Sequence, residues 1–446
     1  MPAELQGYVD FAVGVLAVSK HNLDNSVLLY RPTPVAAPPR QRLVCLLPCQ
    51  GVDSNLIGDD EQVDKSVECI RPSLCARKWE HSGRQQRAIV SNNHICTGFL
   101  LMTVLCTGAS ATTSDSILKI DRFVSAEMSR QKIPGMALAV VKNGQVVLAK
   151  GYGFANIEHQ VPVTTHSIFQ SGSIGKQFTA AAIVLLEEHG KLRLDDKVAR
   201  HLPRTKASWG SITLRHLLTH TSGIPEYEDE VDDRRDYSEH QLTELVGLLS
   251  RRSPPGHKFE YSNSGYLLLG VIIRTITGKF HADYIRENIF EPLGMNTARI
   301  LTDADIVPNR VAGYRMSNGR ILNQEWVSPT FNQTADGCFY LSLNDFVTWE
   351  RAVRARAVLK PESWSQIFTP VVLKSGEEHP YGFAWKITQR GGQTVHGHDG
   401  SFRGFEAILT RYIEEELTLI ALANLAEVDL ARVTEHIAKL IRQERP

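Results

Sequence analysis

The sequence of 446 residues lacks the features that mark several specialised classes of protein. Lys+Arg and Asp+Glu both number 49, so neither sign of charge is in excess. Like-charge blocks and internal repeats do not stand out either. This balance gives no support to nucleic-acid binding or to a basic membrane-binding surface. The composition is that of an ordinary globular protein, and the length suits two or three domain-sized units.

Cysteine is scarce beyond the first quarter of the chain, where only Cys338 occurs. The spacings of the other six do not match common zinc patterns, and no histidine pair completes them. The last three quarters therefore needs no disulfide, and Cys338 is most simply a buried, small apolar residue. The six early cysteines are Cys45, Cys49, Cys69, Cys75, Cys96 and Cys106.

The first 111 residues divide into two segments that do not resemble a folded domain. Residues 1–83 are interrupted by prolines and hold no sustained amphipathic period, which favours a low-order extension that need not belong to the native product. Residues 84–111 follow the three-part layout of a secretory signal: Arg84 and Arg87, an apolar centre at 99–106, and small residues at 109–111. A buried helix or a membrane anchor is the alternative. If the segment is a working signal, the protein is exported to the periplasm or outside the cell; otherwise it is cytoplasmic.

Residues 112–443 have a regular order of predicted elements. A helix from Ser114 is followed by a hairpin with strands at 137–142 and 145–153 around an Asn143-Gly144 turn. A mainly helical region covers about 211–353, with helices at 214–218, 242–250, 265–277 and 344–355. Strands follow at 382–388, 393–398, 405–412 and 417–424, before a final helix from about 430. This order predicts an α/β (α+β) fold: an antiparallel β-sheet flanked by helices, with a helical lobe inserted.

A serine and a lysine three positions apart, Ser173 and Lys176, precede a predicted helix at 177–189 that ends at Gly190. If the helix begins near Ser173, both side chains lie on one face of its first turn. An amine there can take the serine proton, and unpaired N–H groups at the helix start can stabilise an oxyanion. The pair alone is weak evidence, since Ser116 and Lys119 have the same spacing.

Two further clusters lie downstream. Tyr261 and Asn263 are two residues apart, so an extended segment would point both side chains the same way. Tyr261 could exchange a proton with the serine or the leaving group, and Asn263 could bind a substrate carbonyl or amide. The third cluster, Val395-His-Gly-His-Asp-Gly-Ser-Phe-Arg-Gly-Phe405, has glycines that permit close backbone approach to a ligand.

These three clusters, in this order, resemble the serine β-lactamase and penicillin-binding-protein superfamily. The similarity is to the branch of class C β-lactamases, D-alanyl-D-alanine carboxypeptidases and family VIII-type serine esterases, and it covers about residues 114–443. Supporting stretches are Leu192-Arg-Leu-Asp-Asp196, Leu217-Leu-Thr-His-Thr-Ser-Gly-Ile-Pro225, Glu291-Pro-Leu-Gly-Met295 and Tyr381-Gly-Phe-Ala-Trp385.

The resemblance implies a role for each matching position. Ser173 would be the acylated nucleophile and Lys176 its activating partner, while Tyr261 would shuttle protons and Asn263 would bind substrate. His398-Asp399-Gly400 matches the third motif, and the backbone N–H groups of Ser173 and Ser401 would form the oxyanion hole. The family's reaction uses neither a cofactor nor a metal, and the expected partner is a small-molecule or peptide substrate.

The third motif departs from the lysine-containing lactamase pattern. His398 is expected to be only partly charged near neutrality, and Asp399, if it faces the site, would repel an anion. Both changes favour a neutral ester or amide, or a substrate that carries an amine, over penicillins and peptide C-termini. The sequence therefore predicts an esterase or a peptidase/amidase. A β-lactamase or D-alanyl-D-alanine carboxypeptidase acting on cell-wall peptides is the alternative within the family, and a non-turnover sensor or scaffold is the alternative outside it.

Three other interpretations are weaker. An α/β-hydrolase requires glycines two before and two after the serine, but position 171 is a serine. A metal site at His396, His398 and Asp399 is a second alternative. Neither a His-Glu-x-x-His pattern nor another ligand that would complete this site is evident in the sequence. His220 could suggest a catalytic triad, but a structural loop histidine is the expected role.

Overall fold

The computed structural model describes residues 114–202, 206, 209–232 and 234–443. The predicted extension at 1–83 and the signal-like segment at 84–111 lie outside these residues. None of the described helices combines the length and the hydropathy that a membrane-spanning helix needs.

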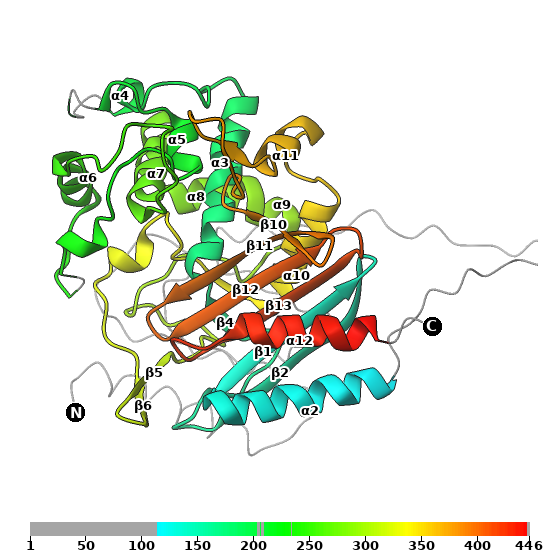
Figure 1. Cartoon of the computed structure of the whole chain (residues 1–446). Coiled ribbons are helices and arrows are strands. Elements are labelled where there is room, and N and C mark those ends of the chain that lie inside the picture. Colours follow the sequence, from blue (N-terminus) through cyan, green and yellow to red (C-terminus); the bar gives the residue numbers. More distant parts are fainter. Residues whose placement is uncertain (1–113, 203–205, 207–208, 233, 444–446) are drawn as a thin grey trace, which may run out of the picture. The chain divides into compact units, whose positions relative to one another are not determined.

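A seven-stranded antiparallel sheet is the centre of the fold, with the strand order β10-β11-β12-β13-β1-β2-β3 (Figure 1). The strands are β1 (Gly135–Lys142), β2 (Gln145–Asn156), β3 (Val161–Pro162), β10 (Lys386–Arg390), β11 (Gln393–Phe402), β12 (Phe405–Tyr412) and β13 (Leu417–Ala423). Three two-stranded pairs accompany it: β4 (Ile168–Gln170) with β7 (Tyr340–Ser342), β5 (Tyr314–Ser317) with β6 (Arg320–Asn323), and β8 (Val371–Val372) with β9 (Glu378–His379).

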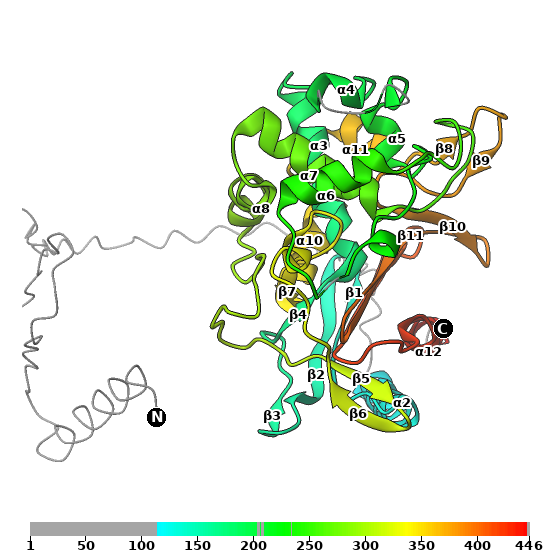
Figure 2. The same ribbon diagram turned by 90° about the vertical axis from the view of Figure 1, so that its left-hand side faces the viewer.

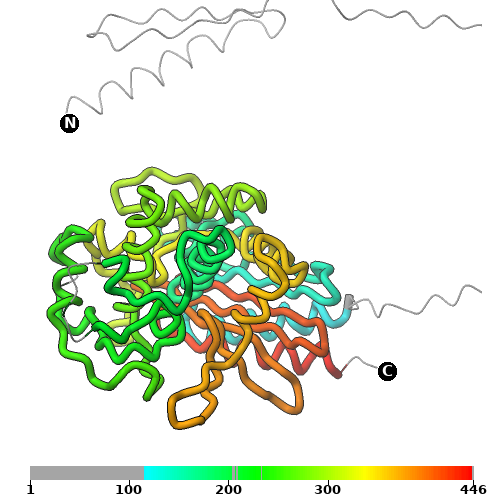
Figure 3. The backbone as a smooth tube through the Cα atoms, turned by 90° about the horizontal axis from the view of Figure 1, so that it is seen from above, coloured from blue at the N-terminus to red at the C-terminus, as the bar shows by residue number. Residues whose placement is uncertain are grey.

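The α-helices cover both faces of the sheet. They are α2 (Ser114–Gln131), α3 (Lys176–Glu188), α4 (Val198–His201), α5 (Leu214–Leu218), α6 (Glu239–Leu248), α7 (Asn263–Thr277), α8 (His281–Ile285), α9 (Glu291–Leu293), α10 (Leu343–Arg354), α11 (Pro361–Ile367) and α12 (Leu430–Arg442). Figure 2 shows α2 and α12 on one side of the sheet and α10 on the other. Seen from above in Figure 3, the green helical region lies beside the teal and orange strands of the sheet.

The two central strands are apolar on both faces because each face is covered. Along β1, Met136, Leu138 and Val140 belong to the core under α2 and α12, while Ala137 and Ala139 belong to the core under the helical region. Strand side chains alternate between faces, so a strand that is covered on both sides has a continuous apolar run. The same alternation holds for β13, whose seven residues are all buried.

The expected fold is confirmed, and most element bounds differ by only a few residues. Asn143 and Gly144 both have positive φ, 50° and 75°, as a two-residue hairpin turn requires. The prediction of a strand from residue 382 was wrong, because β10 begins only at Lys386. Gly382 instead lies against the Ile367 carbonyl so closely that a side chain there would not fit. Cys338 is buried, as expected, and its thiol donates to the Phe331 carbonyl at 2.9 Å.

Candidate active site

Ser173 lies in a short 3₁₀-helix, Gly172–Gly175, that leads directly into α3 at Lys176. The α-helix thus starts three residues later than a start at Ser173, yet the pair still meets: the Lys176 Nζ donates to the Ser173 Oγ at 3.0 Å. Strand β4 pairs with β7, and the Ser171 N–H extends this pairing by donating a hydrogen bond to the Phe339 carbonyl at 2.7 Å. The paired strands hold the turn in place. Aromatic packing of Phe178 anchors the helix itself.

Lys176 is fully buried and surrounded by acceptors. Besides Ser173, its Nζ donates to the Asn263 Oδ1 at 2.6 Å and to the backbone carbonyl of Asp336. Burial alone would lower the pKa of this lysine, but the neighbouring Tyr261, Asp336 and Glu226 side chains outweigh burial and raise the pKa. Lys176 is therefore held as a cation against the serine oxygen.

Tyr261 and Asn263 reach the same lysine from either side of Ser262. Ser262 is extended, with φ −149° and ψ 117°, and α7 begins at Asn263, so the two flanking side chains both point towards Lys176. The Nζ lies 5.0 Å from the centroid of the Tyr261 ring. Tyr261 is 39% exposed and lines the cleft beside Ser173.

Acidic side chains lie behind Asn263 and fix its orientation. Glu228 accepts from the Asn263 Nδ2 at 3.0 Å, and Glu226 accepts from the Asn263 backbone N–H at 2.7 Å. Asp336 accepts from the Tyr227 hydroxyl at 3.0 Å. Loss of solvation, together with the nearby charges of Asp336 and Glu226, raises the pKa of Glu228 to about 7.

His398 differs from the expectation of a partly charged residue. It is buried, and its ring nitrogens contact the Tyr381 hydroxyl at 2.9 Å and the Asp399 carbonyl at 2.5 Å. Burial lowers the pKa of His398 to about 4, so it is neutral at neutral pH and supplies no charge to a substrate.

Asp399 also behaves differently from a free anion in the site. Its carboxylate bonds to the Lys386 ammonium from the neighbouring strand β10. Both side chains line the cleft next to Ser173. The repulsion that Asp399 alone would exert on an anionic substrate is therefore offset by Lys386.

Glycines bring the third motif against the serine. A Cβ at Gly172, where φ is +50°, would lie 2.6 Å from the Ser401 nitrogen, and one at Gly400 would lie 2.9 Å from the Ser173 nitrogen. Both distances are shorter than any side chain tolerates, so the close approach depends on glycine. Two backbone nitrogens beside the serine form the arrangement that can stabilise an oxyanion.

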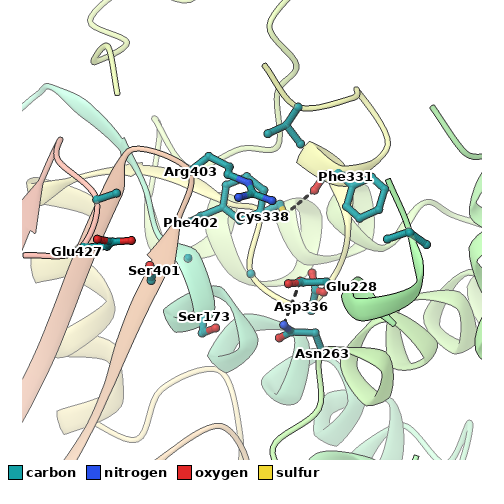
Figure 4. Close-up of a pocket in the computed structure, with 15 residues that line it drawn as sticks. Ser173, Glu228, Asn263, Phe331, Asp336, Cys338, Ser401, Phe402, Arg403 and Glu427 are labelled. Atoms are coloured by element: carbon teal, nitrogen blue, oxygen red, sulfur yellow. Dashed lines mark hydrogen bonds between the residues drawn. The ribbon is translucent and has the colours of Figure 1, made fainter. Parts of the chain in front are cut away.

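The cleft has two halves that share Ser173 and Ser401. The first, about 400 Å³, contains three acidic side chains, Glu228, Asp336 and Glu427, together with Arg403 (Figure 4). The second, about 500 Å³, has an aromatic wall of Phe259, Tyr261 and Tyr381 and the Lys386–Asp399 pair at its edge. In Figure 4, Asn263, Asp336 and Glu228 lie across the pocket from Ser401.

Sequence reasoning did not identify several of these residues as part of the site. Glu226 and Glu228 lie in a loop whose packing the sequence does not reveal, and Lys386 enters from an adjacent strand. Tyr381 was noticed only as part of a supporting stretch. A signal for Glu226 was available, since it directly follows the Leu-Leu-Thr-His-Thr-Ser-Gly-Ile-Pro run.

A metal site does not form at the position considered from the sequence. Among the described residues, no group of three or more His, Cys, Asp or Glu side chains is arranged to hold a metal ion. Both ring nitrogens of His398 already have protein partners, and the ring of His396 stacks on Phe368 at 4.5 Å.

Comparison with known proteins agrees with this geometry. Residues 120–441 match the Beta-lactamase protein family. The chain is 31% identical over 320 residues to penicillin-binding protein 4* of Bacillus subtilis, covering 67% of this chain and 69% of that protein. It is 28% identical to a D-aminopeptidase of Gluconobacter oxydans, covering 70% of this chain and 60% of that protein.

Solved structures share the fold. An octameric penicillin-binding protein homologue from Pyrococcus abyssi superposes with a TM-score of 0.66 at 28% identity, covering 74% of this chain and 78% of that one. A D-amino acid amidase from Ochrobactrum anthropi has the same TM-score at 23% identity, covering 75% and 100%. The extent of the family match and the identity to a curated relative lead to one conclusion: the chain belongs to the β-lactamase family of serine hydrolases.

Proposed function

We propose that the protein hydrolyses amides, peptides or esters of small substrates that carry a free amine, through an acyl-enzyme on Ser173. The observation that carries the proposal is the buried Lys176 ammonium, 3.0 Å from the Ser173 Oγ and 2.6 Å from the Asn263 Oδ1 at the junction of the two halves of the cleft. A serine held against a fixed cation, with backbone nitrogens nearby, suits acyl transfer.

The proposed reaction begins with the pair formed by Lys176 and Tyr261. The raised pKa of Lys176 keeps that amine positively charged, 5.0 Å from the centroid of the Tyr261 ring. The proposed step uses the anionic oxygen of Tyr261 as the proton acceptor, a form that the neighbouring cation stabilises. As the Ser173 Oγ forms its bond to the substrate carbonyl carbon, its proton moves to Tyr261. The backbone nitrogens of Ser173 and Ser401 stabilise the resulting oxyanion.

Collapse of the tetrahedral intermediate breaks the bond to the leaving group, which takes the proton from Tyr261. A water molecule then repeats the sequence: it gives its proton to Tyr261, attacks the acyl carbon, and the released Ser173 oxygen recovers that proton. Asn263 is well placed to bind the substrate, because Lys176 and Glu228 hold the two ends of its amide. Proton and charge balance over the cycle without a cofactor.

The preference for an amine rests on the acidic half of the cleft. Glu228, Asp336 and Glu427 line it, and among the described lining residues Arg403 is the basic one. An ammonium group is attracted to such a site, whereas a carboxylate is repelled. The D-aminopeptidase and the D-amino acid amidase named above, relatives in sequence and in fold, act on related chemistry according to their names and support this choice.

Neutral esters are the second candidate. The aromatic wall of the other half of the cleft suits an uncharged acyl or alcohol group, and neutral His398 removes the cation that a substrate carboxylate would need. The family's β-lactamase and carboxypeptidase activities on carboxylate-bearing substrates would then be weak.

A substrate panel tests the proposal. Residues 112–446 would be assayed with D- and L-amino-acid p-nitroanilides, the matching N-acetylated compounds, p-nitrophenyl esters and nitrocefin, beside the Ser173→Ala variant. We expect the free-amine substrates to have the highest kcat/KM and Ser173→Ala to lose turnover. Faster turnover of the N-acetylated compounds, or turnover that survives in Ser173→Ala, would contradict the proposal.

We also propose that the protein is exported, on the strength of the signal-like segment at 84–111. Expression of the full chain in a bacterial host, followed by N-terminal sequencing of the exported product, tests this. A product that begins near residue 112 supports it, and retention of the segment in a cytoplasmic product would refute it.

A further inference from the structure

His220 makes three contacts with the segment that carries Tyr261. It lies in the loop after α5, and its backbone has a positive φ of 54°. The His220 carbonyl oxygen accepts from the Glu260 N–H at 2.8 Å, and the His220 Nδ1 accepts from the Ser262 N–H at 3.1 Å. The residues immediately before and after Tyr261 are thus both bonded to His220.

The third contact is between the rings themselves. The centroids of the His220 and Tyr261 rings lie 4.1 Å apart with the planes tilted by 32°. His220 is 1% exposed, whereas Tyr261 is 39% exposed. A half-exposed side chain would otherwise sample several rotamers, so the buried imidazole provides the surface that holds the phenol in one position.

Hydrogen bonds fix the orientation of the imidazole. Because the His220 Nδ1 accepts from a backbone N–H and the neutral ring carries one proton, that proton is on Nε2. The Nε2 lies 3.1 Å from the Tyr381 hydroxyl, to which it donates. Tyr381 in turn donates to the His398 Nε2 at 2.9 Å, and His398 donates from Nδ1 to the Asp399 carbonyl at 2.5 Å.

All three side chains of this buried chain of hydrogen bonds are neutral at pH 7. Burial, with the charge of Lys176, lowers the pKa of His220 well below its usual value, and burial raises the pKa of Tyr381. Every donor has one acceptor, so a single arrangement satisfies all of them. The chain links the loop after α5, the segment before β10 and the third motif on β11.

We propose that His220 is a positioning residue for Tyr261, and that the His220–Tyr381–His398 chain of hydrogen bonds holds the phenol at the distance that proton transfer from Ser173 requires. The inference rests on the proton-transfer role of Tyr261 in the proposed function. It gives His398 a role that needs no charge: the third motif orients Tyr261 through Tyr381 rather than binding a substrate carboxylate.

Three variants separate the contacts. His220→Asn keeps an acceptor near the Nδ1 position and tolerates the positive φ, but removes the ring and the bond to Tyr381. His220→Ala removes all side-chain contacts, and Tyr381→Phe removes only the hydroxyl. Since small misplacements of a catalytic group cost up to about 100-fold in rate, we expect kcat to fall about 10-fold in His220→Asn and Tyr381→Phe and about 100-fold in His220→Ala.

The assay measures kcat and KM on the best substrate from the panel, the rate of Ser173 labelling by a fluorescent phosphonate, and the melting temperature. A positioning role lowers kcat and the labelling rate together and leaves KM within about threefold in the His220 variants, because His220 is buried and lines neither half of the cleft. His281→Asn is the matched control, since His281 is also a buried histidine of the helical region and its ring packs against Phe280 and Phe339. It should alter the melting temperature alone.

The outcomes distinguish the inference from the proposed function. If Tyr261→Phe is inactive while folded His220→Asn and Tyr381→Phe keep the wild-type kcat and labelling rate, the positioning role is refuted and the function stands. If Tyr261→Phe keeps the wild-type kcat, the proposed mechanism is refuted and the inference with it. Loss of kcat in proportion to the loss of melting temperature, in the control as well, would also refute the inference.

Discussion

Replacing Lys176 with methionine should lower both the stability and the activity of the protein. The methionine fills nearly the same volume but donates no hydrogen bond. The Asp336 carbonyl and the Asn263 Oδ1 then lose their donor in a region that water does not reach freely. An unsatisfied buried acceptor costs about 1–3 kcal/mol, so the two together cost about 2–6 kcal/mol.

The expected decrease in melting temperature is on the order of 10 °C. Ser173→Ala is the matched control: the serine oxygen lines the open cleft, where water can replace it, so that variant should melt close to the wild type. Differential scanning fluorimetry measures both, and phosphonate labelling measures the reactivity of the serine. If Lys176→Met melts at the wild-type temperature, or labels at the wild-type rate, the reasoning about this buried cation is wrong.

Three further predictions concern the walls of the cleft. Because the pKa of Glu228 is about 7, its carboxyl group is protonated below that pH and charged above it, so KM for an amine substrate should fall several-fold between pH 6 and 7.5 and stay flat in Glu228→Gln. Asp399→Asn should free Lys386 and lower KM for nitrocefin, a carboxylate substrate, by several-fold in steady-state assays. Gly172→Ala should abolish turnover, because the new Cβ would displace the Ser401 nitrogen.

Each of these has a control. For the N-acetylated substrate, KM should not depend on Glu228. If KM for the amine substrate still changes with pH in Glu228→Gln, another group is titrating and the prediction is wrong. Lys386→Met should raise the KM for nitrocefin. If neither Asp399→Asn nor Lys386→Met changes this KM, the Lys386–Asp399 pair does not influence the binding of a carboxylate substrate. Gly190→Ala has a similar positive φ of 67° with no atom near the new Cβ, so it should lose about 1 kcal/mol of stability but no activity.

Local signals in the sequence were sufficient for much of the fold. The hairpin around Asn143-Gly144 and the apolar period of α12 depend on neighbouring residues, which sequence reasoning can read directly. Strand β10 begins later than expected because the Phe383 N–H donates to the Ile367 carbonyl at 3.0 Å, and that carbonyl lies against Gly382. The strand pattern does not include the segment that holds Ile367.

The sequence by itself determined which residues could carry the chemistry, because Ser173, Lys176, Tyr261 and Asn263 stand in short motifs whose spacing has a chemical meaning. Only the tertiary structure decided their charge and their partners. Burial made His398 neutral, a neighbouring strand brought Lys386 to Asp399, and a loop brought His220 against Tyr261. Charge and burial depend on what packs around a residue, and those neighbours are distant in the chain.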